Sequence, residues 1–128
     1  SMRRIEEIIT ERMKKLDRST KIIIVGFSQG AALALFTGLS SEIKFSGIIS
    51  LSGYQPITTI SDVTKKNTPI LAMHGMHDDI IGIDIAKLSF KDNSPEYFNF
   101  KTYEMGHEVI DSQLLDIQQF LLGIKDYD

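Results

Sequence analysis

Residues 21–38 constrain the fold of this chain more than any other segment. Four β-branched residues at 22–25 are typical of a parallel strand that is covered on both faces. The sequence GFSQG follows at 26–30, and then an apolar stretch that begins with AALAL. This pattern predicts a strand, a sharp turn and a helix, with the hydroxyl of Ser28 exposed at the corner. The glycines on both sides of the serine indicate that a side chain at either position would crowd the turn.

Two later segments carry groups that could activate a serine. The apolar run 69–74 leads to a loop with Asp78 and Asp79, and the run 97–103 leads to a loop with His107. A serine hydroxyl is a weak nucleophile at neutral pH and needs an adjacent base, which a carboxylate orients. Because the carboxyl ends of parallel strands meet at one edge of a sheet, we expect Ser28, His107 and an aspartate to converge there.

The chain resembles the acyl-protein thioesterase and phospholipase/carboxylesterase family of α/β hydrolases. The matching pieces are GFSQGAALAL at 26–35, LSGYQP at 51–56, HGMHDDII at 74–81 and YEMGHEV at 103–109. The order serine, acid, histidine along the chain is also that of the α/β-hydrolase fold. The resemblance implies that the catalytic residues are Ser28, Asp78 and His107.

The family pattern H-G-x-x-D around the acid selects Asp78 over Asp79. The sequence departs from the family at two positions of this loop, where many members have an acidic residue in place of Met76 and proline in place of Asp79. The resemblance also implies that the backbone N–H of Gln29 is an oxyanion donor.

The activity implied by the resemblance is hydrolysis of carboxylic esters or thioesters of acyl chains, on a lipid or an acylated protein. It needs no cofactor and no metal. Apolar and aromatic residues near the expected site are candidates for an acyl-binding groove, although each of them is also a candidate core or loop residue. These are Phe27, Tyr54, Met76, Ile80, Ile81 and Met105.

Family members carry several strands ahead of the serine strand, and an early H-G-x-G loop supplies a second oxyanion N–H. Only one helical segment precedes residue 21 here. We therefore expect a single truncated α/β-hydrolase domain over residues 1–128, a partial α/β-hydrolase fold with a mostly parallel sheet of about four strands and the N-terminal strands missing. Loss of one oxyanion donor typically costs about 10²–10³ in rate.

The hydrophobic pattern places helices and strands in alternation, which implies a parallel sheet. The last helix carries Ile110, Leu114, Ile117 and Leu121 on one face, with Asp111 as its N-cap. Segment 58–66 is weakly patterned. We expect helices at 3–16, 29–39, 84–91 and 111–124, and strands at 21–26, 45–52, 69–74 and 97–103.

Composition excludes several classes of protein. A length of 128 residues suits one domain, and a net charge of −3 without a basic run argues against a nucleic-acid partner. The chain has no cysteine, which excludes disulfides and a thiol nucleophile and is compatible with the cytoplasm, where we expect it. No apolar run reaches the roughly 18 residues of a transmembrane segment.

Three further hypotheses stay open at this level. Without preceding strands, the strand at 21–26 becomes an apolar sheet edge, through which two copies could form a homodimer. A catalytically impaired fragment or pseudoenzyme would act only as an interaction module. A metallohydrolase is the third hypothesis, because the loop HGMHDD and His107 contain metal-ligand residue types.

Overall fold

The computed structural model describes residues 2–16, 20–56 and 67–124. The weakly patterned segment 58–66 lies outside the described residues. The described elements follow the predicted order, with boundaries within three residues of the expected ones. They are α1 (Met2–Met13), β1 (Ile23–Phe27), α2 (Gln29–Ser40), β2 (Gly47–Leu51), β3 (Ile70–Gly75), α4 (Ile83–Ser89), β4 (Phe98–Tyr103) and α5 (Ser112–Leu122).

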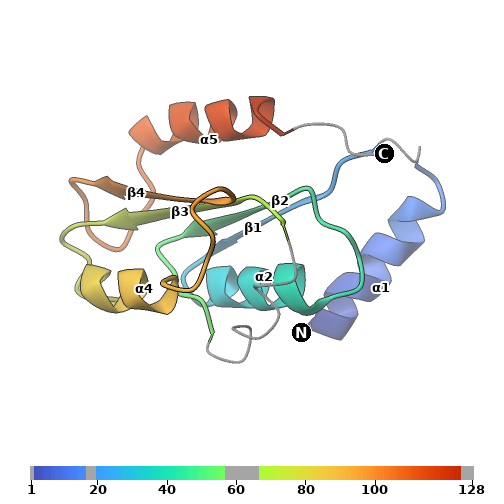
Figure 1. Ribbon diagram of the computed structural model, residues 1–128, viewed down its shortest axis with the longest axis horizontal. Helices are drawn as coiled ribbons and strands as arrows, with labels where there is room; N and C mark the ends of the chain where they lie inside the picture. Colours follow the sequence, from blue (N-terminus) through green and yellow to red (C-terminus); the bar gives the residue numbers. More distant parts are fainter. Residues whose placement is uncertain (1, 17–19, 57–66, 125–128) are drawn as a thin grey trace.

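The sheet has the strand order β1-β2-β3-β4, and every neighbouring pair is parallel. Val25 pairs with Ile49, and Ile49 pairs with Leu71. Helices α2 and α4 cover one face of the sheet and α5 covers the other, while α1 packs beside α2 (Figure 1). The predicted α/β class and the four-stranded parallel sheet flanked by helices are therefore confirmed.

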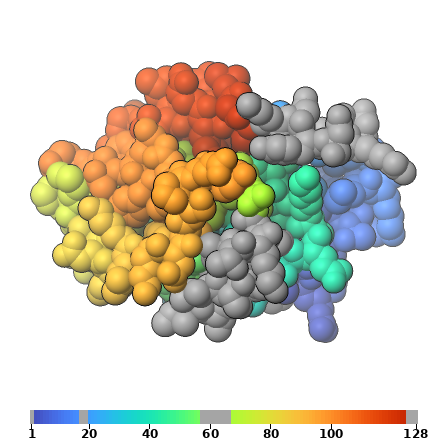
Figure 2. Space-filling model, viewed as in Figure 1, coloured from blue at the N-terminus to red at the C-terminus, as the bar shows by residue number. Residues whose placement is uncertain are grey.

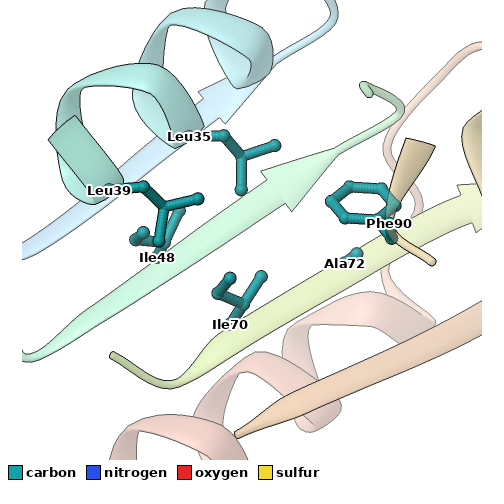
Figure 3. Packing of buried hydrophobic residues seen from close by; sticks show 6 residues of the cluster. All are labelled: Leu35, Leu39, Ile48, Ile70, Ala72 and Phe90. Atoms are coloured by element: carbon teal, nitrogen blue, oxygen red, sulfur yellow. The ribbon is translucent and has the colours of Figure 1, made fainter. Parts of the chain in front are cut away.

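The core consists of two apolar clusters, one on each face of the sheet. On the α2 face the side chains of the helix meet those of β2, β3 and Phe90 (Figure 3). On the α5 face Ile49, Leu71 and Met73 meet Ile117 and Phe120. Because successive strand residues point to opposite faces, both clusters draw on β2 and β3, which explains why both strands are mostly apolar. The buried members of the α2-face cluster are Leu35, Leu39, Ile48, Ile70, Ala72 and Phe90.

Helix α5 stands out on one side of the molecule (Figure 2). It packs with a different face from the predicted one. Ile117 contacts the core as expected, but Leu114 is 59% exposed and Leu121 is 41% exposed. The face of α5 that packs on the sheet instead carries Gln113, which is fully buried, and Phe120. Apolar residues occupy both of these faces of the helix, so the periodicity alone selected the wrong face.

The predicted N-cap of α5 is also wrong. Asp111 has a helical backbone conformation (φ −60°, ψ −33°), and its side chain makes no capping hydrogen bond. The side chain of Gln113 accepts a hydrogen bond of 2.7 Å from the backbone N–H of Ile110 instead. A buried amide that reaches back to the entry of the helix replaces the expected cap.

Strand β1 forms one edge of the sheet in the described part of the chain, as predicted. Ser28 N donates to Leu51 O, and Ile22 O accepts from Ser46 N, so alternate residues of β1 point their backbone groups toward β2. The backbone groups of Val25 and Phe27 therefore point outward. Their side chains are 53% and 41% exposed. Pairing of two copies through this edge stays a prediction.

None of the helices in the described residues is both long enough and apolar enough to span a bilayer.

Candidate active site

Ser28 occupies the single residue between β1 and α2. Its backbone has φ 59° and ψ −120°, a conformation that L-residues rarely adopt and that costs on the order of 1–3 kcal/mol. Two sets of hydrogen bonds hold it there. Its N–H donates to Leu51 O over 2.8 Å, and its carbonyl accepts from the N–H groups of Ala31 and Ala32. The sheet and the helix together thus force the side chain outward at the corner.

The two glycines around Ser28 have different roles. A Cβ added to Gly26 would lie 2.1 Å from the carbonyl oxygen of Gly30, so position 26 admits only glycine. A Cβ added to Gly30 would meet nothing within 4 Å. The expectation that a side chain at position 30 would crowd the turn is therefore wrong. It is the backbone of Gly30 that fills the space beside Gly26.

His107 lies on the loop between β4 and α5, and its ring faces Ser28. Its Nε2 is 2.9 Å from Ser28 Oγ, across 79 residues of sequence. The ring packs against that of Phe27, with centroids 5.0 Å apart. The loop comes close to the end of β3 because position 75 has no side chain: a Cβ on Gly75 would lie 2.3 Å from Met105 O. Strand β3 and Phe27 therefore position the imidazole.

Asp78 lies on the loop after β3, on the far side of the imidazole from Ser28. Its Oδ2 is 2.8 Å from His107 Nδ1, and its side chain has no exposed surface. The backbone N–H groups of Ile80 and Ile81 donate to Oδ1 over 2.9 Å and 2.8 Å. Asp79, by contrast, is exposed. The loop thus presents one of its two aspartates to His107.

The charge of Asp78 is stabilised despite its burial. Burial by itself raises the pKa of this carboxyl, but the hydrogen bonds from Ile81, His107 and Ile80 together outweigh it. The pKa therefore lies below its ordinary value of 3.8. An ionised Asp78 at neutral pH favours the tautomer of His107 that carries its hydrogen on Nδ1, which leaves Nε2 free to accept from the Ser28 hydroxyl.

An open groove of about 440 Å³ begins at Ser28. Of the six groove candidates, Phe27, Tyr54, Ile80 and Ile81 line it, and Met76 and Met105 do not. Met105 is 5% exposed and belongs to the core, and its backbone packs on Gly75. The other residues that line the groove are Ser28, Gln29 and Gly30.

Gln29 begins α2, and its backbone N–H has no acceptor among the described residues. Gln29 lies directly after Ser28 and at the positive end of the helix dipole. An N–H at this place can donate to an oxyanion that forms on an acyl group bonded to Ser28 Oγ.

Ser52, which the sequence analysis did not single out, holds the His107 loop through a hydrogen bond to the residue after His107. It is fully buried, has a positive φ of 55°, and donates from Oγ to Glu108 O over 3.2 Å. Its N–H donates to Met73 O over 2.9 Å. The signal available in the sequence was a serine directly after an apolar strand, which alone is too common to select it.

The imidazole and carboxylate groups of the described residues do not assemble a metal site. No group of three or more His, Cys, Asp or Glu side chains in residues 2–16, 20–56 and 67–124 is arranged to hold a metal ion. His77 is exposed and contacts Glu104 over 2.7 Å, on the surface.

Comparison with known proteins identifies relatives over most of the chain. The family model described as Phospholipase/Carboxylesterase matches residues 1–124. Acyl-protein thioesterase 1 of Saccharomyces cerevisiae is 37% identical over 130 residues, which cover 94% of this chain and 57% of the relative. Acyl-protein thioesterase 1 of Aspergillus fumigatus is 33% identical over 127 residues, which cover 89% of this chain and 52% of the relative.

Solved structures also align with most of the chain. SOBER1 of Arabidopsis thaliana aligns with a TM-score of 0.81 at 25% identity, over 94% of this chain and 61% of that one. Acyl-protein thioesterase 2 of Zea mays aligns with a TM-score of 0.77, over 94% of this chain and 63% of that one, and its 21% identity shows a shared fold. The chain thus spans between half and two thirds of the length of these relatives.

Proposed function

Because the chain belongs to the phospholipase/carboxylesterase family, whose fold is that of the α/β hydrolases, we propose that it is a serine hydrolase for esters or thioesters of acyl chains. The observation that carries this proposal is the continuous path of hydrogen-bonding distances from Ser28 Oγ through His107 to Asp78, at 2.9 Å and 2.8 Å. Side chains from three loops that are far apart in sequence meet in the order that acyl transfer requires.

In the proposed reaction, Ser28 Oγ attacks the acyl carbonyl carbon while its proton moves to His107 Nε2. Asp78 holds Nδ1–H and stabilises the imidazolium that forms. The imidazolium then gives its proton to the leaving alkoxide or thiolate as the bond from the carbonyl carbon breaks. A water molecule, deprotonated by His107, hydrolyses the acyl-serine and restores the hydroxyl.

The substrate class follows from the groove and from the relatives. Phe27, Tyr54, Ile80 and Ile81 offer an apolar surface next to the nucleophile, which suits an acyl chain. The similar proteins named acyl-protein thioesterases point to an acylated protein as the substrate, and the family description points to a lipid ester. The acyl group is common to both.

A fluorophosphonate probe tests the assembly of the site, because it reacts with a serine only where a base activates the hydroxyl. We expect the probe to label Ser28 in the unaltered chain and to label neither Ser28→Ala nor His107→Ala. Hydrolysis of a p-nitrophenyl acyl ester should disappear in the same two variants. Matched controls are Ser94→Ala and His77→Ala, since both residues are exposed and lie outside the groove.

The same experiment separates the alternative functions. A folded chain that takes no probe would be an interaction module or pseudoenzyme. Hydrolysis that survives Ser28→Ala and stops with a chelator would identify a metallohydrolase.

A further inference from the structure

Asp78 contacts a second imidazole besides that of His107. His74 Nε2 lies 3.3 Å from Asp78 Oδ2 and 2.7 Å from the carbonyl oxygen of Ile81. His74 is 1% exposed and stands near the end of β3, one residue before Gly75. The reaction described above gives this buried histidine no role.

The partners of His74 determine where its ring carries a hydrogen. A carbonyl oxygen and a carboxylate oxygen only accept hydrogen bonds, so the Nε2 that faces both of them must be the N–H. This Nε2–H donates to Ile81 O, and the negatively charged Asp78 Oδ2 lies 3.3 Å from the same nitrogen. His74 is thus a donor to the acid loop.

The Asp78 carboxylate has four nitrogen neighbours, of which three are hydrogen-bond donors and the fourth, His74 Nε2, is a charge contact. Oδ1 accepts from the N–H groups of Ile80 and Ile81, and Oδ2 faces His107 Nδ1 and His74 Nε2. Two carboxylate oxygens offer about four lone-pair sites. Because this side chain has no exposed surface, bulk water cannot replace a donor that is lost.

His74 also holds the loop that carries the acid. Ile81 donates its N–H to Asp78 Oδ1 and accepts the Nε2–H of His74 at its carbonyl oxygen. The peptide groups of Ile81 are therefore fixed from both sides. The same residue lines the groove at Ser28, so this arrangement joins the acid, its loop and the groove wall.

We propose that His74 is a positioning residue, whose Nε2–H fixes the Asp78 carboxylate and loop 78–81 in the orientation that brings Oδ2 to His107 Nδ1–H. The proposal rests on the proposed function for its effect on rate, but its geometric content does not depend on turnover. The two can therefore fail separately.

The first test uses the unaltered chain with 15N-labelled histidine. Long-range 15N–1H correlation spectra at neutral pH report which ring nitrogen carries the hydrogen. We expect His74 to carry one on Nε2. A His74 ring protonated on Nδ1 alone would overturn the proposal, because such an Nε2 cannot donate to Ile81 O.

The second test compares two substitutions of the same residue. In the unaltered chain the His74 ring stacks near Phe100, with centroids 6.4 Å apart. His74→Phe keeps a ring at this place but removes the hydrogen-bond donor. His74→Gln loses the ring and keeps an amide N–H at about the reach of Nε2. His77→Gln is the matched control, since His77 is exposed.

The readouts are the Nδ1–H resonance of His107 and the rate at which a fluorophosphonate labels Ser28. In His74→Phe we expect that resonance to move upfield and labelling to slow by about ten- to a hundredfold, the usual effect of removing an outer partner that orients a site group. His74→Gln should recover most of both, and His77→Gln should change neither.

Wild-type readouts in His74→Phe would refute the role, and so would equal losses in His74→Phe and His74→Gln, because the donor would then not be the reason. If His74→Phe does not fold, the tautomer measurement on the unaltered chain decides. A chain that takes no probe but whose His107 resonance depends on His74 would refute the proposed function and support the positioning role.

Discussion

Gly26 and Gly30 occupy equivalent places in the G-x-S-x-G motif, yet the structure predicts opposite effects for their replacement by alanine. In Gly26→Ala the new Cβ would lie 2.1 Å from Gly30 O, 2.3 Å from Gly30 C and 2.6 Å from Ala31 N. All three atoms are backbone, so no side chain can rotate away. Separation to 3.0 Å, below which real contacts of this kind essentially do not occur, requires the start of α2 to withdraw by about 0.9 Å.

This displacement would act on both stability and reactivity. Overpacking of this kind costs about 1–3 kcal/mol of unfolding free energy. Because Ser28 is the residue next to α2, the same movement shifts Oγ relative to His107 Nε2, and a misplacement of about 1 Å costs roughly a hundredfold in rate. In Gly30→Ala the Cβ meets nothing within 4 Å, and alanine favours the helix by about 0.5–1 kcal/mol.

Urea denaturation followed by circular dichroism measures the stability difference. We expect the midpoint of Gly26→Ala to fall and that of Gly30→Ala to rise, so that the two variants differ by about 1.5–4 kcal/mol. The rate of fluorophosphonate labelling in Gly26→Ala measures the displacement of Ser28. If Gly26→Ala were as stable as Gly30→Ala and reacted at the wild-type rate, the close approach of β1 and α2 would be wrong.

Three further predictions follow from charges and from the sheet edge. The pKa of Asp78 is lowered, so its ionised form stabilises the fold above about pH 4, and this contribution is lost as the pH falls through the folded-state pKa. The difference in unfolding free energy between the unaltered chain and Asp78→Asn should therefore be largest at neutral pH and shrink in acid. A difference independent of pH would contradict this. Burial and the contact with Asp116 raise the pKa of Tyr103 above its ordinary value of 10.0. The free energy of unfolding should therefore fall as the pH rises past about 10, where only the unfolded tyrosine ionises. Chemical denaturation at pH 9 to 11 should show a weaker fall in Tyr103→Phe. Val25→Lys places a charge on the exposed edge of β1 and should lower the apparent mass in sedimentation at high concentration; a monomeric unaltered chain would refute the predicted homodimer.

Much of the fold could be predicted from local patterns. The β-branched run at 22–25 and the AALAL stretch after Ser28 each specify their own element, and the apolar segments of β2 and β3 indicate burial on both faces. Alternation of strands and helices then implies parallel pairing. Helix α5 is where this reasoning failed, because apolar residues lie on both of its long faces and only packing against the sheet selects between them.

The three expected site residues were chosen for their chemistry and their places after strands, and the structure brings them within hydrogen-bonding distance. Neither Ser52 nor His74 was assigned a role of its own from the sequence, because the significance of each lies in what it touches. Ser52 reaches the backbone of Glu108 across 56 residues, and His74 reaches Asp78 and Ile81 only through the fold of the loop after β3.

The sequence by itself determined the elements, their order and the chemical groups that end three of the strands, because propensity, periodicity and glycine placement act over a few neighbouring residues. Only the tertiary structure decided which groups meet. The register of four parallel strands places Ser28, Asp78 and His107 at one edge, and the close backbone approaches at Gly26 and Gly75 bring their loops within reach. Such contacts depend on how distant segments pack, and short-range preferences do not specify that packing.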